Sequence, residues 1–229
     1  MSKQQNEKVI LITGASSGIG AATVQKVVAA GHKAVITARS ADKLNALAER
    51  LGTDKVLPVT ANVSKLADIS NVVQQAKQRF GRLDVVFANA GTGLNTAGIA
   101  DGDPDEWQTM LDVNVNGLLF TAKASLPALK ETQGHFIVTS SVAGKITLQG
   151  SVYGASKWFA YGFGQNLAAE MKQWNGRCTT ICPGMVNTPF FDEAKPDKLQ
   201  PEDIADAVMF AISANSRCDV REITLMPAN

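Results

Sequence analysis

A tyrosine and a lysine stand four positions apart in the segment Tyr153-Gly-Ala-Ser-Lys157. Residues at positions i and i+4 lie on the same face of a helix, so the phenol and the ammonium are expected to be neighbours. A positive charge beside a phenol favours the phenolate, and free tyrosine titrates at about pH 10. The pairing therefore predicts a tyrosine whose pKa is lowered toward neutrality, as proton transfer requires. A solvated helix face can also carry such a pair by chance, so its meaning depends on the rest of the chain.

The elements that would position this pair follow from the hydrophobic pattern, which alternates between strand and helix along the whole chain. Buried-looking strands separated by helices predict a Rossmann-like α/β fold, a doubly wound parallel sheet of seven strands with helices on both faces. The ligands of such sheets lie beyond the carboxyl ends of the strands. We expect strands over Val9–Thr13, Ala34–Thr37, Lys55–Thr60, Leu83–Ala88, Phe136–Ser140, Arg177–Cys182 and Glu222–Met226. We expect helices over Ile19–Ala30, Ala41–Leu51, Lys65–Phe80, Pro104 to about Lys130, Tyr153–Lys172 and Pro201–Ser213.

Length and composition describe one globular domain over residues 1–229, with residues 1–8 as a polar leader. The net charge is +1 and the Lys and Arg residues are scattered, so neither a nucleic-acid partner nor a membrane surface is expected. No apolar run reaches the roughly 18–20 residues that span a bilayer, and no signal peptide is visible. Three cysteines make no disulfide framework and two histidines make no metal cluster, so we expect a cytoplasmic protein without a metal.

A glycine-rich turn follows the first expected strand, in Thr13-Gly-Ala-Ser-Ser-Gly-Ile-Gly20. Its spacing, Gly-x-x-x-Gly-x-Gly, differs from the dinucleotide fingerprint Gly-x-Gly-x-x-Gly. The physics is the same, because glycines let the backbone turn tightly and approach a pyrophosphate at a helix N-terminus. A strand-to-helix turn without a ligand is the plain alternative. The candidate cofactor-binding residues of this turn are Gly14, Ser16, Ser17, Gly18, Ile19 and Gly20.

The second expected strand ends at Thr37-Ala38-Arg39-Ser40. An NAD-specific enzyme carries Asp or Glu there to bind the ribose 2′-hydroxyl, and this chain has Ala38 in that position. Arg39 can hold a 2′-phosphate in fork geometry. We therefore expect NADP(H) rather than NAD(H), the alternative being that Arg39 is only a surface charge.

With these motifs in place, the chain resembles the short-chain dehydrogenase/reductase family over essentially its whole length. Two positions depart from the family pattern: Asn62 stands before Val63 where Asp is usual, and Ser17 stands where many NADP-preferring members have a basic residue. The matching segments are the glycine turn, Asn89-Ala90-Gly91, Asn114, Ser140-Ser141-Val-Ala-Gly144, the pair Tyr153 and Lys157, and Pro183-Gly184-Met-Val-Asn-Thr188. The resemblance extends the cofactor-binding set to Asn62, Val63, Asn89, Ala90, Gly91, Tyr153, Lys157, Pro183, Gly184, Val186 and Thr188, beside Arg39 and the turn.

The resemblance implies an oxidoreductase that transfers a hydride between NADP(H) and a carbonyl or secondary alcohol. Tyr153 would be the general acid in reduction and the base in oxidation, with Lys157 lowering its pKa and holding the nicotinamide ribose. Ser141 would bond the substrate oxygen, although counting back from Tyr153 favours Ser140 instead. Asn114 would hold a water that links Lys157 to solvent. Family members are mostly dimers or tetramers, which implies a homodimer or homotetramer through helices 104–130 and 153–172.

The sequence does not identify the substrate, and two other functions stay open. One is reduction of a carrier-bound 3-oxoacyl group, and the other is a nucleotide-sensing protein that keeps the fold without the chemistry. The short segment between Thr188 and Pro201 carries Phe190 and Phe191. These rings can be apolar walls of the site or can pack onto the sheet, and the same two interpretations hold for Leu94, Gln149 and Trp158.

Overall fold

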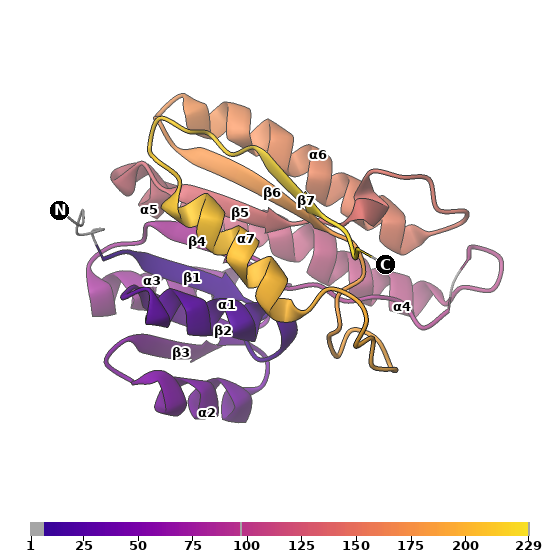
Figure 1. Ribbon diagram of the computed structural model, residues 1–229, viewed down its shortest axis with the longest axis horizontal. Coiled ribbons are helices and arrows are strands. Elements are labelled where there is room, and N and C mark those ends of the chain that lie inside the picture. Colours follow the sequence, from indigo (N-terminus) through magenta and orange to yellow (C-terminus); the bar gives the residue numbers. More distant parts are fainter. Residues whose placement is uncertain (1–6, 97, 229) are drawn as a thin grey trace.

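A seven-stranded parallel sheet runs through the centre of the molecule (Figure 1). The computed structural model describes residues 7–96 and 98–228. The strand order is β3-β2-β1-β4-β5-β6-β7, and every neighbouring pair is parallel. This confirms the expected doubly wound sheet, whose strand order reverses between β1 and β4. The strands are β1 (Val9–Thr13), β2 (Lys33–Ala38), β3 (Val56–Thr60), β4 (Val85–Ala88), β5 (His135–Thr139), β6 (Arg177–Pro183) and β7 (Glu222–Leu225).

Helices cover both faces of the sheet because its strands are apolar on both sides. In β1, Ile10 and Ile12 belong to the core on one face, and Val9 and Leu11 belong to the core on the other. Figure 1 shows α1 and α7 in front of the sheet and α5 behind it. The first face is covered by α1 (Gly18–Ala29), α2 (Ala41–Leu51) and α7 (Pro201–Ser213), and the second by α3 (Leu66–Phe80), α5 (Gly117–Thr132) and α6 (Val152–Lys172).

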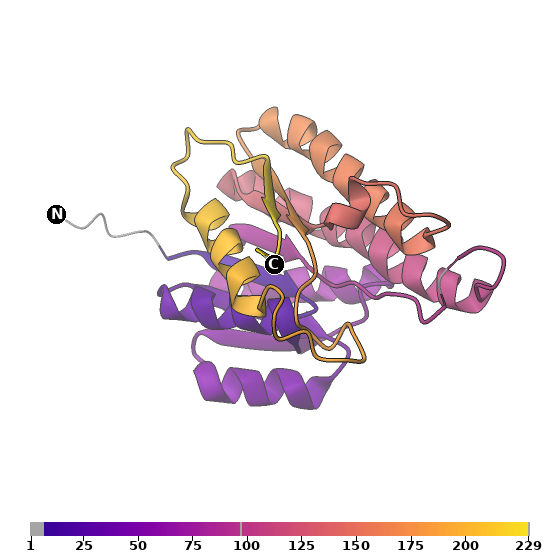
Figure 2. The ribbon, with the colours of Figure 1, turned by 45° about the vertical axis from the view of Figure 1, so that its right-hand side comes forward.

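The helical region expected from Pro104 to about Lys130 is confirmed in extent, but it is not one regular α-helix. The chain forms α4 (Pro104–Leu111), then a π-helical turn over Asp112–Asn116, then α5. Figure 2 shows α4 leading into α5 on the side of the sheet away from α7. A π-helical turn accommodates one extra residue and is frequent at functional sites. Hydrophobic spacing does not reveal such an insertion, because the residues on both sides keep the helical period.

The start of the chain also differs from expectation. Residues 1–6 of the predicted leader lie outside the described residues, but Lys8 is anchored to the fold. Its ammonium donates to the Ile212 carbonyl at 2.8 Å, and its own carbonyl accepts from the Lys33 amide at 2.9 Å. Lys8 therefore belongs to the folded domain and not to a leader.

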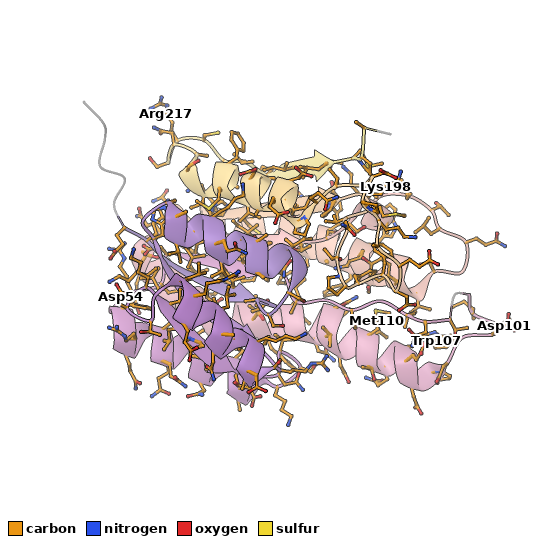
Figure 3. The ribbon with its side chains drawn as sticks, turned by 60° about the horizontal axis from the view of Figure 1, so that its bottom comes forward. Asp54, Asp101, Trp107, Met110, Lys198 and Arg217 are labelled. Carbon is orange, nitrogen blue, oxygen red and sulfur yellow. The ribbon has the colours of Figure 1, made fainter. Side chains whose placement is uncertain are left out.

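The two ends of the sheet carry different connections. In Figure 3, Asp54 and Arg217 mark turns at the end where strands begin, whereas Asp101, Trp107 and Lys198 mark the end where strands finish. The loops after β4, β5 and β6 project from this second end, which is where a doubly wound sheet binds ligands (Figure 1). Within the described ranges, no helix is long and apolar enough to cross a membrane.

Candidate active site

A cleft of about 940 Å³ opens at the carboxyl ends of the strands. It runs from Arg39, after β2, past the glycine turn after β1, to Tyr153 at the start of α6. Its size is that of a cofactor or substrate site. Of the predicted site residues, all except Gly20 and Asn114 line this cleft.

The glycine turn owes its shape to backbone conformations that only glycine adopts readily. Gly14 has φ of 65° and Gly18 has φ of 50°. A Cβ atom on Gly14 would lie 2.9 Å from the Cα of Ala90, so a side chain there would push β1 away from β4. Gly20 does not line the cleft, because a Cβ on it would lie 2.3 Å from the Gly14 carbonyl oxygen. Its role is close packing of α1 against the turn. Ser17 precedes α1 and makes no side-chain cap, so its hydroxyl and the first amides of α1 can bind an anion.

Cationic and polar groups gather where β2 ends. Arg39, Ser40 and Lys43 line this end of the cleft, and Lys43 was not predicted from the sequence. Ser40 precedes α2 and makes no side-chain cap, so its hydroxyl is also available to a ligand. Nearby, the side-chain carbonyl of Asn62 accepts from the Ser64 amide at 3.0 Å, which fixes the amide orientation beside the cleft.

Asn89 fastens three strands together beneath the cleft. Its side-chain amide donates to the Thr13 carbonyl at 3.1 Å, and its side-chain oxygen accepts from the Thr139 hydroxyl at 3.4 Å. The hydroxyl of Thr13 in turn accepts from the backbone amides of Asn89 and Ala90, each at 3.0 Å. These bonds join the ends of β1, β4 and β5, so the floor of the site is rigid.

The structure distinguishes the two adjacent serines that follow β5. The Ser140 hydroxyl is buried and donates to the Lys157 carbonyl at 2.8 Å, which ties the strand end to α6. The Ser141 hydroxyl lies on the cleft, which Tyr153 also lines, and its proximity lowers the pKa of that tyrosine. It also donates to the Pro183 carbonyl at 3.3 Å and accepts from the Ala143 amide at 3.1 Å. Ser141 is therefore the serine that faces the tyrosine.

Burial controls the protonation of Tyr153 and Lys157. The Lys157 ammonium lies 5.7 Å from the centre of the Tyr153 ring and donates to the Thr139 carbonyl at 3.2 Å. Desolvation raises the pKa of Tyr153 to about 12, although the adjacent Ser141 hydroxyl acts in the opposite direction. Desolvation also lowers the pKa of Lys157 to about 8. The two groups are neighbours as expected, but the lowered tyrosine pKa is wrong for this structure, because burial disfavours the phenolate more than the adjacent groups favour it.

Asn114 is buried on the π-helical turn, where its side chain is fully engaged. It accepts from the Thr92 amide at 2.9 Å, and it donates to the Thr92 carbonyl at 3.0 Å and to the Ser156 hydroxyl at 3.1 Å. A separate cavity of about 10 Å³ is lined by Asn114, Lys157 and Thr121, among others. This volume suits one water molecule, held beside the Lys157 ammonium.

The structure also shows which other residues line the cleft, including some whose place the sequence left undecided and some that were not predicted. Phe190 and Phe191 line the cleft, so these two rings are apolar walls of the site. The other three candidates, Leu94, Gln149 and Trp158, do not line it. Gly93, Leu148 and Met185 also line it. Met185 lies inside the matching segment Pro183–Thr188 and Gly93 lies two residues after Gly91, whereas nothing in the local sequence marks Leu148.

The family model described as short chain dehydrogenase matches residues 8–199. An uncharacterized oxidoreductase of Staphylococcus aureus strain MRSA252 is 38% identical over 226 residues, covering 96% of this chain and 97% of that protein. An alcohol dehydrogenase from the archaeon Thermococcus sibiricus, complexed with 5-hydroxy-NADP, has a TM-score of 0.90 at 30% identity and 97% coverage of both chains. A 3-ketoacyl-(acyl-carrier-protein) reductase from Brucella melitensis, complexed with NADH, has a TM-score of 0.89 at 27% identity, covering 96% of this chain and 97% of that one.

The family match spans most of the chain, and the similar proteins cover nearly all of it. The strand order, the glycine turn and the cleft agree with these matches. The chain belongs to the short-chain dehydrogenase/reductase family of oxidoreductases.

Proposed function

We propose that this protein is an NADP(H)-dependent carbonyl reductase or alcohol dehydrogenase. The observation that carries the proposal is the convergence of Ser141, Tyr153 and Lys157 at one end of a cleft whose other end holds Arg39 and Lys43. A non-catalytic nucleotide sensor has no need of a buried lysine and a serine beside the same tyrosine.

The residues present fit a nicotinamide dinucleotide along the whole cleft. The glycine turn, with its positive φ angles and uncapped Ser17, suits the pyrophosphate. Asn62 and Val63 would hold the adenine, and Asn89 to Gly91 would lie along the middle of the cofactor. The nicotinamide end would be held by Pro183, Gly184, Val186 and Thr188, with Tyr153 and Lys157 at its ribose.

The phosphate preference rests on the end of β2. Ala38 offers no carboxylate to a ribose 2′-hydroxyl, whereas Arg39, Ser40 and Lys43 offer two cations and a free hydroxyl to a 2′-phosphate. The similar proteins of known structure include one complexed with an NADP derivative and one complexed with NADH, so they support a dinucleotide of either kind, and the preference for NADP(H) is proposed from this local charge alone.

The chemistry divides between cofactor and protein. The reduced nicotinamide supplies the hydride. Tyr153, kept neutral by its raised pKa, donates a proton to the carbonyl oxygen, and Ser141 donates a hydrogen bond to the same oxygen as charge develops on it. Lys157 and the small cavity beside Asn114 lie where a water can return the proton to Tyr153. A phenol that is protonated at neutral pH is in the state that the general acid of a reduction requires.

The protein would act in the cytoplasm as a homodimer or homotetramer. The faces of α5 and α6 that point away from the sheet expose Leu119, Trp158 and Phe159, with exposed fractions of 36%, 49% and 38%. Apolar side chains of this size on adjacent helices suit contact with a second subunit.

Reduction of a carrier-bound 3-oxoacyl group is the alternative reaction, and a basic docking patch would favour it. The residues after Phe191 at the rim of the cleft are Asp192 and Glu193, and Lys195 lies 3.6 Å from the Glu193 carboxylate. This mixed, partly acidic rim gives an acidic carrier no evident docking site.

The proposal is tested by fluorescence titration with NADPH and NADH, followed by NADPH consumption with a panel of ketones. We expect tighter binding of NADPH, and on the order of 10- to 100-fold weaker NADPH binding in Arg39→Ala with NADH binding unchanged, because a charge-assisted bond contributes about 1.5–3 kcal/mol. Lys43→Ala should show the same selectivity with a smaller loss. Tighter binding of NADH by the natural chain would contradict the NADP assignment.

A further inference from the structure

Large apolar side chains are exposed at the end of the cleft that holds Tyr153. Leu148, Met185 and Phe190 all line the cleft, and their exposed fractions are 43%, 41% and 43%. Single exposed apolar residues are common on protein surfaces, but several that gather in one concave site mark a ligand surface. The side chains beside the reacting tyrosine therefore offer apolar contact.

Phe190 covers Tyr153 directly. The centres of the two rings are 5.5 Å apart with an interplanar angle of 53°, and Phe191 meets Phe190 edge-on at 5.2 Å. Gly93 makes this arrangement possible, because a Cβ atom there would lie 2.7 Å from Cζ of Phe190. The Phe190 ring can therefore lie against Tyr153 only because residue 93 has no side chain, since a side chain there would take the space of the ring.

Charge is distributed unevenly along the same cleft. Among the described residues that line it, the cations are Arg39, Lys43 and Lys157. Arg39 and Lys43 lie at the far end, where β2 finishes. Lys157 is buried and donates to the Thr139 carbonyl. A substrate carboxylate near Phe190 and Met185 would thus find no cation of the cleft lining beside it other than the buried Lys157. In the segment that follows Phe191, Asp192 and Glu193 come before Lys195, which lies 3.6 Å from the Glu193 carboxylate.

From these contacts we infer that the site takes an uncharged ketone or aldehyde with an apolar substituent and rejects carbonyl compounds that carry a carboxylate. Phe190 is then a specificity-determining residue, which contacts the apolar substituent beside the reacting carbonyl. The inference rests on the proposed function and adds the chemical class of the substrate. In the reaction the carbonyl π bond breaks, its carbon gains the hydride and its oxygen gains the Tyr153 proton, which solvent replaces. The nicotinamide loses the corresponding two electrons.

A pair of substrates tests the inference, namely ethyl acetoacetate and acetoacetate, which share the reacting ketone, whereas the ester replaces the carboxylate with an uncharged group that carries an apolar ethyl chain. We expect kcat/KM with NADPH to be on the order of 100-fold higher for the ester, since a carboxylate buried without a partner is strongly disfavoured. Phe190→Ala should lower kcat/KM for the ester on the order of 10-fold, mainly through KM, with little effect on the acid. Phe210→Ala, at an exposed position outside the cleft, should leave both values unchanged.

A second variant makes the test independent of lost packing. Met185→Arg places a cation beside the apolar end, so kcat/KM for acetoacetate should rise relative to that for the ester, while the dissociation constant of NADPH stays the same. Equal or faster reduction of the acid by the natural chain would overturn the inference and leave the proposed function standing. Failure to reduce either compound with NADPH or NADH would overturn both.

Discussion

The buried imidazole of His135 predicts a specific dependence of stability on pH. The Thr179 hydroxyl donates to the Val220 carbonyl, so it must accept from Nε2 of His135, which lies 2.7 Å away. The neutral ring therefore carries its proton on Nε2. Its Nδ1 atom is buried and has no hydrogen-bond partner among the described residues. Desolvation lowers the pKa of His135 to about 3, and Arg177 and Lys8 contribute in the same direction.

The magnitude follows from the difference between the two states. In the unfolded chain His135 titrates at its ordinary pKa of 6.5, so below that pH the unfolded state binds a proton that the folded state does not bind. The free energy of unfolding is therefore unaffected by this proton above pH 6.5, and it decreases as the pH falls below that value, because only the unfolded state takes up the proton. With one pKa unit equal to about 1.36 kcal/mol, the loss between about pH 7.5 and about pH 5 is about 2 kcal/mol. Because pH 5 lies well above the folded pKa, this figure is set by the unfolded pKa.

Urea denaturation at both pH values measures this loss when the natural chain is compared with His135→Gln. The amide nitrogen of glutamine reaches the position of Nε2 and can donate to Thr179, but it does not titrate. We expect the natural chain to lose about 2 kcal/mol more than the variant over this interval. Burial also lowers the pKa of His32, the other histidine of the chain. His32→Gln, measured in the same way, separates the contribution of His32 from that of His135. Parallel pH dependences of the natural chain and His135→Gln would refute the reasoning.

Two further predictions concern the catalytic helix. Since desolvation lowers the pKa of Lys157 to about 8, reductive kcat/KM should be flat near neutrality and fall about tenfold per pH unit above that value. Lys157→Arg, which stays charged to above about pH 12, should abolish this decline, and a decline retained in the variant would contradict the assignment. A Cβ atom on Gly144 would lie within 2.6 Å of the Lys157 carbonyl carbon, so Gly144→Ala should cost about 1–3 kcal/mol in urea denaturation. Gly162→Ala, in open space on α6, should stabilise by about 0.5–1 kcal/mol, and equal effects of the two substitutions would argue against the packing of Gly144 on Lys157.

Much of the fold and site could be predicted because the informative residues sit at strand ends. The glycine turn, Asn89 and Ser141 each follow a strand directly, and parallel strands bring such residues to one edge of a sheet. Local spacing is enough to place them, since neither long-range packing nor exact helix boundaries change which edge they reach.

What the sequence did not reveal depends on contacts between distant segments. The contact of Phe190 with Gly93 joins the loops after β6 and β4, and neither residue belongs to a recognisable pattern. The Tyr153 pKa was misjudged because helical spacing shows that Lys157 is near but not how deeply both groups are buried. The π-helical turn was missed because one extra residue between two apolar helices leaves both periods intact.

The most direct test of the account is NADPH-dependent reduction of ethyl acetoacetate by Tyr153→Phe. The only other tyrosine in the chain, Tyr161, lies on the same helix and bonds Glu222 at 2.9 Å, so Tyr161→Phe is a matched control. Tyr153→Phe should lower kcat on the order of 100- to 10,000-fold with the affinity for NADPH largely kept, because the hydroxyl that it removes is the proton donor but only one of many groups proposed to hold the cofactor. Tyr161→Phe should keep kcat near that of the natural chain. Near-normal turnover by Tyr153→Phe would contradict the claim that this tyrosine protonates the substrate.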